Sequence, residues 1–253
     1  MRMRIAAAVV AMATLVAACA MRDPWVLATG QHPQEFHRTI TERVDVKFLL
    51  FLPAGFDPHG ATKYPLLIFL HGSGESGDDL NSVKVQGPPK IVESTRDFPF
   101  IVASPQSTAA YLGFSPAKLN AMLDELIARL PVDPDRVYLT GLSMGGRWSY
   151  GWASLNPERF AAIAPVSGDW DLDGACRLRD VPVWAFHGAK DTAVPLAGDL
   201  AMIEAIKECH GDARISVLPD LGHNAWDTAY GDPALYAWFL AHRRSTNLKP
   251  HEP

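Results

Sequence analysis

The chain has 253 residues, of which 23 are Lys or Arg and 28 are Asp or Glu, so its formal net charge is −5 at pH 7. The hydrophobic share of 48% is ordinary for a globular protein, and the sequence has no basic patch that would favour nucleic acid as a partner. It has no internal repeat and no low-complexity segment, and its length suits one α/β domain.

The first 18 residues carry the features of a secretory signal peptide. Arg2 and Arg4 precede an apolar run at residues 5–16, and small residues then lead to Cys19. The tetrapeptide VAAC that ends at Cys19 resembles the lipobox of bacterial lipoproteins. This resemblance implies cleavage before Cys19 and its lipidation, which would anchor the protein to a membrane of the bacterial cell envelope, on the periplasmic side or at the outer membrane. An uncleaved anchor is the alternative, because residues 5–21 carry no charge.

The next segment, residues 19–35, is polar, contains proline and lacks periodicity, so we expect a tether to a folded domain at residues 36–247. That domain is predicted to begin with two strands, 36–40 and 44–52, which a short turn joins into an antiparallel pair. The run YPLLIFL at residues 64–70 is apolar throughout, as expected of a strand buried on both faces.

Beyond this point, strands are predicted to alternate with helices. Residues 76–97 hold at least one helix or turn that the pattern does not place. Strands are expected at residues 100–104, 137–140, 160–166, 183–187 and 214–218, and helices at residues 116–130, 144–155, 196–209 and 233–243. The alternation predicts an α/β fold with a mostly parallel central sheet and helices on both faces. Catalytic groups in such sheets lie at the carboxyl ends of the strands.

The pentapeptide Gly141-Leu-Ser143-Met-Gly145 follows one of these strands and precedes a helix. This is the context of a G-x-S-x-G nucleophile elbow, in which Ser143 is expected to have a positive φ. Gly141 and Gly145 would lack side chains because the strand and the helix approach closely there. A glycine-rich turn before a surface helix is the simpler interpretation of the pentapeptide alone.

Two further polar residues follow strands in the chain order of a Ser-Asp-His triad. Asp191 comes after strand 183–187, and His223 comes after strand 214–218. His223 would take the proton of Ser143, and Asp191 would hold the imidazole in the right tautomer. Asp220 is a rival for the acid, but it precedes His223 on the same loop and would struggle to reach its far side.

An oxyanion hole needs two backbone donors aimed at the developing negative charge. The N–H groups of Met144 and Ser73 are the candidates, and Gly72 and Gly74 would let the backbone around Ser73 approach a substrate. His71 is expected to brace this turn rather than to act as a base.

The motifs LIFLHGSGESGDD, RVYLTGLSMGGRWSYGWASLNPERFAAIAPVSG, WAFHGAKDTAVP and GHNAWD resemble the compact serine esterases of the α/β-hydrolase superfamily. The resemblance is greatest to the predicted peptidase and esterase group akin to feruloyl esterases and polyhydroxybutyrate depolymerases. It implies a carboxylic-ester hydrolase that uses Ser143, Asp191 and His223 and needs no cofactor. The oxyanion turn reads HGSGE rather than the HGGG of classical lipases, which argues against a lipase.

Only about 16 residues join the strands that end at 166 and begin at 183, so no large cap domain is expected. The resulting open cleft would suit short-chain, aromatic or polymer-borne acyl esters. Trp170, Trp226 and Tyr111 are candidates for its walls, although core packing is an equal alternative for each.

Cys176 and Cys209 each precede a predicted strand of the same sheet. They could form a disulfide in an oxidising compartment, or be two small buried thiols. The nine His residues form no metal-ligand pattern, so no metal is expected.

The expected partners are therefore a small-molecule or polymer-borne ester substrate and, through the lipidated N-terminus, a membrane. Two other functions stay open. A prolyl-oligopeptidase-like serine peptidase would use the same triad, and a non-catalytic envelope binding module would not need it.

Overall fold

The computed structural model describes residues 43–108 and 113–244. The described residues from Val44 onward belong to one compact unit. The predicted signal peptide, Cys19, the tether, strand 36–40 and Tyr111 all lie outside the described residues. In the described ranges, we find no helix with the length and apolar character that crossing a membrane requires.

The described part of the chain builds a seven-stranded sheet with the strand order β1-β3-β2-β4-β5-β6-β7. Neighbouring strands are parallel, except that β1 runs antiparallel to β3. The strands are β1 (Phe48–Phe51), β2 (Tyr64–Leu70), β3 (Ile101–Pro105), β4 (Val132–Leu142), β5 (Ala162–Val166), β6 (Val183–Gly188) and β7 (Ala213–Leu218).

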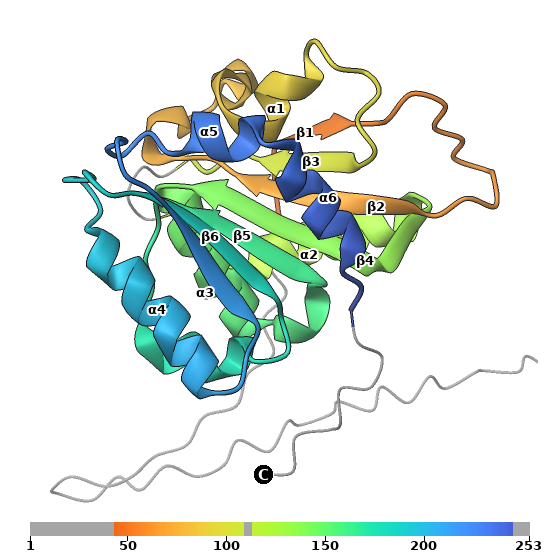
Figure 1. Cartoon of the computed structure of the whole chain (residues 1–253). Coiled ribbons are helices and arrows are strands. Elements are labelled where there is room, and N and C mark those ends of the chain that lie inside the picture. The colour runs from red at the N-terminus through yellow and green to blue at the C-terminus, as the bar shows by residue number, and fades with distance from the viewer. Residues whose placement is uncertain (1–42, 109–112, 245–253) are drawn as a thin grey trace, which may run out of the picture. The chain divides into compact units, whose positions relative to one another are not determined.

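Helices cover both faces of this sheet (Figure 1). They are α1 (Gly87–Val92), α2 (Pro116–Arg129), α3 (Met144–Leu155), α4 (Leu196–Glu208), α5 (Trp226–Gly231) and α6 (Pro233–Ala241). Short 3-10 helices lie at Ser73–Glu75, Leu80–Val85, Pro157–Arg159 and Leu172–Leu178.

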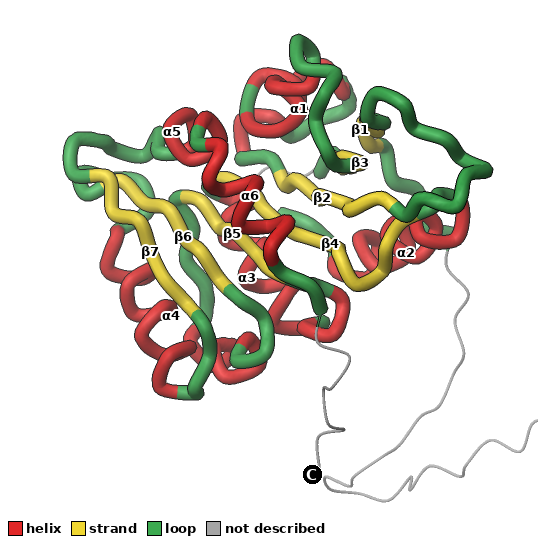
Figure 2. Tube along the Cα trace, turned by 45° about the vertical axis from the view of Figure 1, so that its right-hand side comes forward, coloured by secondary structure: helices red, strands yellow, loops and turns green. Residues whose placement is uncertain are grey.

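The alternation of side chains along the strands divides the core in two. In β2, Leu66, Ile68 and Leu70 belong to a buried cluster with side chains of α2, α3 and α4, whereas Leu67 and Phe69 belong to a second cluster with side chains of α1, α5 and α6. The strand is apolar throughout because both of its faces are covered. Figure 2 shows the two helical layers on either side of the strands. The predicted α/β fold, with a mostly parallel sheet and helices on both faces, is confirmed.

Some boundaries differ from those that the sequence predicts. The first described strand spans only Phe48–Phe51 of the expected 44–52, and the strand before Ser143 begins at Val132 rather than at 137. α5 was not predicted, because its six residues are too few for a periodic pattern. The connection from β5 to β6 holds only a 3-10 helix, and no large cap lies there.

Cys176 and Cys209 form a disulfide in the structure, with their Cα atoms 5.2 Å apart. Cys176 lies in the 3-10 helix Leu172–Leu178, and Cys209 is the C-cap of α4. The bond therefore joins two elements that precede the neighbouring strands β6 and β7.

Candidate active site

Ser143 lies between the end of β4 and the start of α3, in a sharp turn. Its φ is 52° and its ψ is −116°, so the predicted positive φ is confirmed. A side chain on Gly145 would collide with the backbone of Leu70, and one on Gly141 would collide with the backbone of Gly145. The close approach of strand and helix thus requires glycine at both positions and places Ser143 at the N-terminus of α3.

The structure brings Ser143, Asp191 and His223 together from three separate loops. The Nε2 atom of His223 lies 2.9 Å from the Ser143 hydroxyl oxygen, and its Nδ1 atom lies 2.7 Å from Asp191 Oδ2. A ring that donates from Nδ1 to the carboxylate leaves Nε2 free to accept the serine proton. The arrangement has the geometry that a nucleophile, a base and an orienting acid require.

Asp191 is held as a carboxylate acceptor. Its side chain is fully buried, and its Oδ1 atom accepts hydrogen bonds from the backbone N–H groups of Ala193, at 2.8 Å, and Val194, at 2.9 Å. Burial alone would raise the pKa of Asp191, but the hydrogen bonds from His223 and from these N–H groups lower it below its ordinary value. The group therefore stays charged, as the orienting acid of a triad must.

Asp220, the rival acid, points elsewhere. Its side chain is 88% exposed and pairs with Lys190 at 3.2 Å. The structure thus directs Asp191, and not Asp220, at His223.

Contacts that the sequence did not predict hold the His223 loop. Ser167 donates a hydrogen bond from its hydroxyl to the backbone carbonyl of His223 at 2.9 Å. Ser167 itself has a positive φ of 49° and follows β5 directly. The Trp226 ring lies edge-on to His223, with 5.3 Å between ring centroids. The positive φ of Ser167 was not predicted, because this serine does not stand in a G-x-S-x-G pattern.

The turn after β2 is braced by His71, as expected. The imidazole is completely buried, donates from Nδ1 to the Gly72 carbonyl at 2.6 Å and accepts the Ser107 N–H at Nε2 at 2.9 Å. Burial lowers its pKa, which keeps it neutral. A Cβ on Gly72 would press on Leu142, whereas one on Gly74 would meet open space. Packing therefore restricts the residue at position 72 and leaves position 74 unrestricted.

A cavity of about 530 Å³ opens beside Ser143. Ser73 and Met144, the predicted oxyanion residues, line it together with His223. The other lining residues are Arg147, Trp148, Asp169, Trp170, Ala193 and Val194. Trp170 thus lines the cavity, as predicted, whereas Trp226 is not among its lining residues and instead contacts His223.

Aromatic and charged side chains form one wall of this cavity. Trp148 and Trp170 lie with their ring centroids 5.2 Å apart. Arg147 pairs with Asp169 at 3.2 Å, and its guanidinium group lies 5.5 Å from the centre of the Trp170 ring. Arg147 and Trp148 follow Ser143 on α3, so the helix that positions the nucleophile also supplies this wall.

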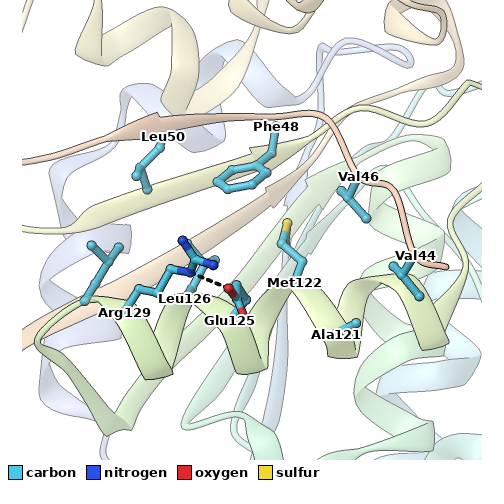
Figure 3. Close-up of a pocket in the computed structure, with 10 residues that line it drawn as sticks. Val44, Val46, Phe48, Leu50, Ala121, Met122, Glu125, Leu126 and Arg129 are labelled. Carbon is cyan, nitrogen blue, oxygen red and sulfur yellow. Dashed lines mark hydrogen bonds and ion pairs between the residues drawn. The ribbon is translucent and has the colours of Figure 1, made fainter.

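A separate apolar groove lies between β1 and α2 (Figure 3). Val44, Val46, Phe48 and Leu50 face Met122 and Leu126 across it. It contains none of the predicted site residues. Within residues 43–108 and 113–244, no three His, Cys, Asp or Glu side chains come together as a metal site would require.

Comparisons with known proteins agree with this fold. Residues 114–231 match the model of the dienelactone hydrolase family. The chain is 26% identical over 171 residues to "Probable feruloyl esterase C" of Aspergillus terreus, an alignment that covers 65% of this chain and 62% of that protein. Over 73 residues it is 34% identical to a bifunctional acetylxylan esterase/xylanase of Neocallimastix patriciarum, which covers 29% of this chain and 11% of that protein.

The crystal structure of a thermostable esterase superimposes with a TM-score of 0.68 at 26% sequence identity, over 79% of this chain and 60% of the other. The chain thus spans less than two thirds of the length of each of these three proteins.

Proposed function

The chain belongs to the α/β-hydrolase superfamily, and on that premise we propose that it is a serine hydrolase that cleaves carboxylic esters through an acyl-enzyme. The observation that carries this proposal is the unbroken set of contacts from Asp191 through His223 to Ser143, next to an open cavity. Burying a charged carboxylate and straining a serine backbone both destabilise a fold. Their presence beside one histidine is explained if the three residues act together in catalysis.

In the proposed reaction, the Ser143 oxygen attacks the ester carbonyl carbon while His223 Nε2 takes the hydroxyl proton. The carbonyl oxygen becomes an oxyanion, for which the N–H groups of Ser73 and Met144 are the proposed donors. The carbon–oxygen bond to the alcohol then breaks, and His223 returns the proton to the departing alcohol. A water molecule repeats the sequence on the acyl-enzyme, releases the acid and restores Ser143.

We further propose substrates with short, aromatic or polymer-borne acyl groups. The support is the open cavity and the paired Trp148 and Trp170 rings, which offer flat apolar surface close to Ser143. Within residues 43–108 and 113–244 no large cap covers this edge, which favours bulky substrates over buried fatty chains. Anchoring in a bacterial cell envelope through lipidated Cys19 remains a proposal that rests on the pattern of the first 19 residues.

A labelling experiment tests the reaction class. The full chain is treated with a fluorophosphonate probe, which reacts with activated serines, and is then assayed on acetyl, butyryl, feruloyl and long-chain acyl esters. Ser143→Ala should abolish labelling and hydrolysis. The matched control is Ser94→Ala, which alters a serine at the end of α1 whose hydroxyl bonds only to the Ile91 carbonyl.

Three outcomes count against the proposal in different ways. An unlabelled wild-type chain contradicts the serine-hydrolase assignment and favours the binding module. Labelling with cleavage of anilides but not of esters favours the peptidase. Preference for long acyl chains would contradict the proposed substrate class alone.

A further inference from the structure

A second histidine lies directly behind the acid of the predicted triad. His187 is the penultimate residue of β6, and Asp191 follows it by four residues in the loop after that strand. The side chains of His187, Asp191 and Asp199 are all fully buried. The reaction proposed above uses only Asp191 among them, so the burial of the other two calls for a separate explanation.

His187 makes close polar contacts with both of its ring nitrogens. Its Nε2 atom lies 2.9 Å from the Val194 carbonyl oxygen and 3.2 Å from Asp191 Oδ2. Its Nδ1 atom lies 2.9 Å from Asp199 Oδ2. Asp191 Oδ2 therefore contacts two imidazole nitrogens, one of His223 and one of His187.

The partners fix where the ring protons are. A carbonyl oxygen only accepts hydrogen bonds, so His187 must donate from Nε2 to Val194. Asp191 Oδ2 lies 3.2 Å from the same nitrogen. On the other side, Asp199 holds Nδ1, and Asp199 in turn accepts a hydrogen bond from the Tyr150 hydroxyl.

We propose that His187 is a positioning residue for the proposed hydrolase reaction: it sets the place and the charge of Asp191, and Asp199 and Tyr150 hold it there. The inference rests on the proposed function. It acts in two ways, because His187 contacts the Asp191 carboxylate itself and also anchors the carbonyl of Val194, whose N–H group donates to Asp191 Oδ1. Residues from β6, α3 and α4 thereby brace one carboxylate.

The charges around His187 support this role. Burial lowers the pKa of His187, but its hydrogen bonds to Asp199 and Val194 and the charges of Asp199 and Asp191 raise it overall. The other titratable groups that face this cluster are Tyr150, which bonds to Asp199, and Asp169, which acts on Asp199 through its charge; His223 faces it across Asp191.

A positive or strongly polarised His187 stabilises the Asp191 carboxylate. Removing it should leave Asp191 more basic and less firmly oriented.

The first test uses only the wild-type chain, so it requires no substrate and no substituted variant. The full chain, labelled with nitrogen-15 in histidine, is studied by long-range proton–nitrogen NMR, which identifies the ring nitrogens that carry hydrogen. We expect His187 to carry hydrogen on Nε2 at neutral pH. An unprotonated Nε2 would overturn the proposal, because Val194 and Asp191 both need a donor there.

The second test measures the acid itself. The carboxyl carbon of Asp191 is titrated by carbon-13 NMR in the wild type, in His187→Asn and in His187→Gln. His187→Asn should raise the pKa of Asp191 by about one unit, the size expected when a close opposite charge is removed. His187→Gln should raise it less, because the glutamine amide reaches the position of Nε2 and can still donate. His242→Asn, which alters a histidine bonded to the Trp238 carbonyl at the end of α6, is the matched control.

The outcomes separate a positioning role from a purely structural one. A folded His187→Asn in which Asp191 titrates as in the wild type would overturn the proposal. If both His187 variants fail to fold, the protonation of Nε2 in the wild type decides. Both measurements hold whether or not the chain hydrolyses esters, so failure of the proposed function is distinguishable from failure of this inference.

If the chain hydrolyses esters, two kinetic measurements test the proposal as well. The acid limb of kcat/KM should move to higher pH in His187→Asn, because a more basic Asp191 attracts the proton of His223 more strongly. The value of kcat should fall about tenfold while KM changes little, since a less firmly oriented Asp191 misplaces His223 without altering the cavity. His187→Gln should recover part of both. An acid limb that stays at its wild-type position in a folded His187→Asn would contradict the proposal.

Discussion

The hydroxyl of Ser167 donates to the backbone carbonyl of His223 at 2.9 Å, and it does so from a residue in a left-handed backbone conformation. Ser167 follows β5 and is completely buried, so a residue at the end of the central sheet holds the loop that carries the predicted base. The contact fixes the backbone of His223 while its side chain stays free to face Ser143.

We therefore expect Ser167→Ala to lower kcat about tenfold with little change in KM, because a loosened loop misplaces the base without altering the cavity. Steady-state kinetics on a short-chain ester checks this. Ser216→Ala, which alters a serine on β7 that accepts a hydrogen bond from Trp184, serves as the control and should keep wild-type kcat. Equal kinetics of Ser167→Ala and the wild type would show that the loop keeps its position without the Ser167 hydrogen bond.

Asp191→Asn should reduce kcat by about four orders of magnitude, because an amide that donates to Nδ1 would stabilise the wrong tautomer of His223. Folding should survive, as the side chain keeps its shape. Circular dichroism and ester hydrolysis measure the two effects. Asp220→Asn is the paired control, since this exposed side chain contacts Lys190 and not His223. Loss of activity in Asp220→Asn, with Asp191→Asn active, would reassign the acid.

Gly145→Ala should destabilise the fold strongly, because the new methyl group would overlap the Leu70 backbone. Neither strand nor helix can move aside without losing core contacts, so we expect a loss of about 3 kcal/mol or more in the free energy of unfolding. Gly74→Ala is the comparison, since its Cβ would meet nothing within 4 Å. Urea denaturation of the two variants tests this contrast, and comparable midpoints would refute it.

Asp133 lies near the start of β4, at the end of this strand away from Ser143. Its carboxylate should make the free energy of unfolding depend on pH. Burial raises its pKa, but hydrogen bonds from Arg136 and from the Asp135 N–H, and the charge of Arg243, bring it below its ordinary value of 3.8. A depressed pKa in the folded state means that the contribution is fully present above pH 3.8 and is lost as pH falls through the lower folded value.

Asp133→Asn should therefore lower the free energy of unfolding at neutral pH by about 1 kcal/mol, the scale of a partly exposed ion pair. The difference from the wild type should shrink as acid protonates Asp133. Urea denaturation at a series of pH values measures it. A difference that is constant across the acid range would mean that the carboxylate charge is not responsible.

Several strands, helices and turns of this protein are determined by short stretches of its sequence. The apolar run of β2 specifies a strand buried on both faces, and the helix α2 begins at its predicted residue, Pro116. The pentapeptide around Ser143 specified a strained turn, because Gly141 leaves room for the backbone of Gly145 four residues further on. Periodicity and turn chemistry are short-range properties, so the sequence alone was sufficient for them.

Contacts between distant segments were decided only by the tertiary structure. Spacing and chain order suggested Asp191 over Asp220, but only the packed sheet displays which carboxylate faces His223. His187 was merely a strand-end histidine until α4 and α3 brought Asp199 and Tyr150 against it. Hydrogen bonds of this kind depend on side-chain direction to within an ångström or so. That direction follows from how the strands and helices pack, which no local pattern encodes.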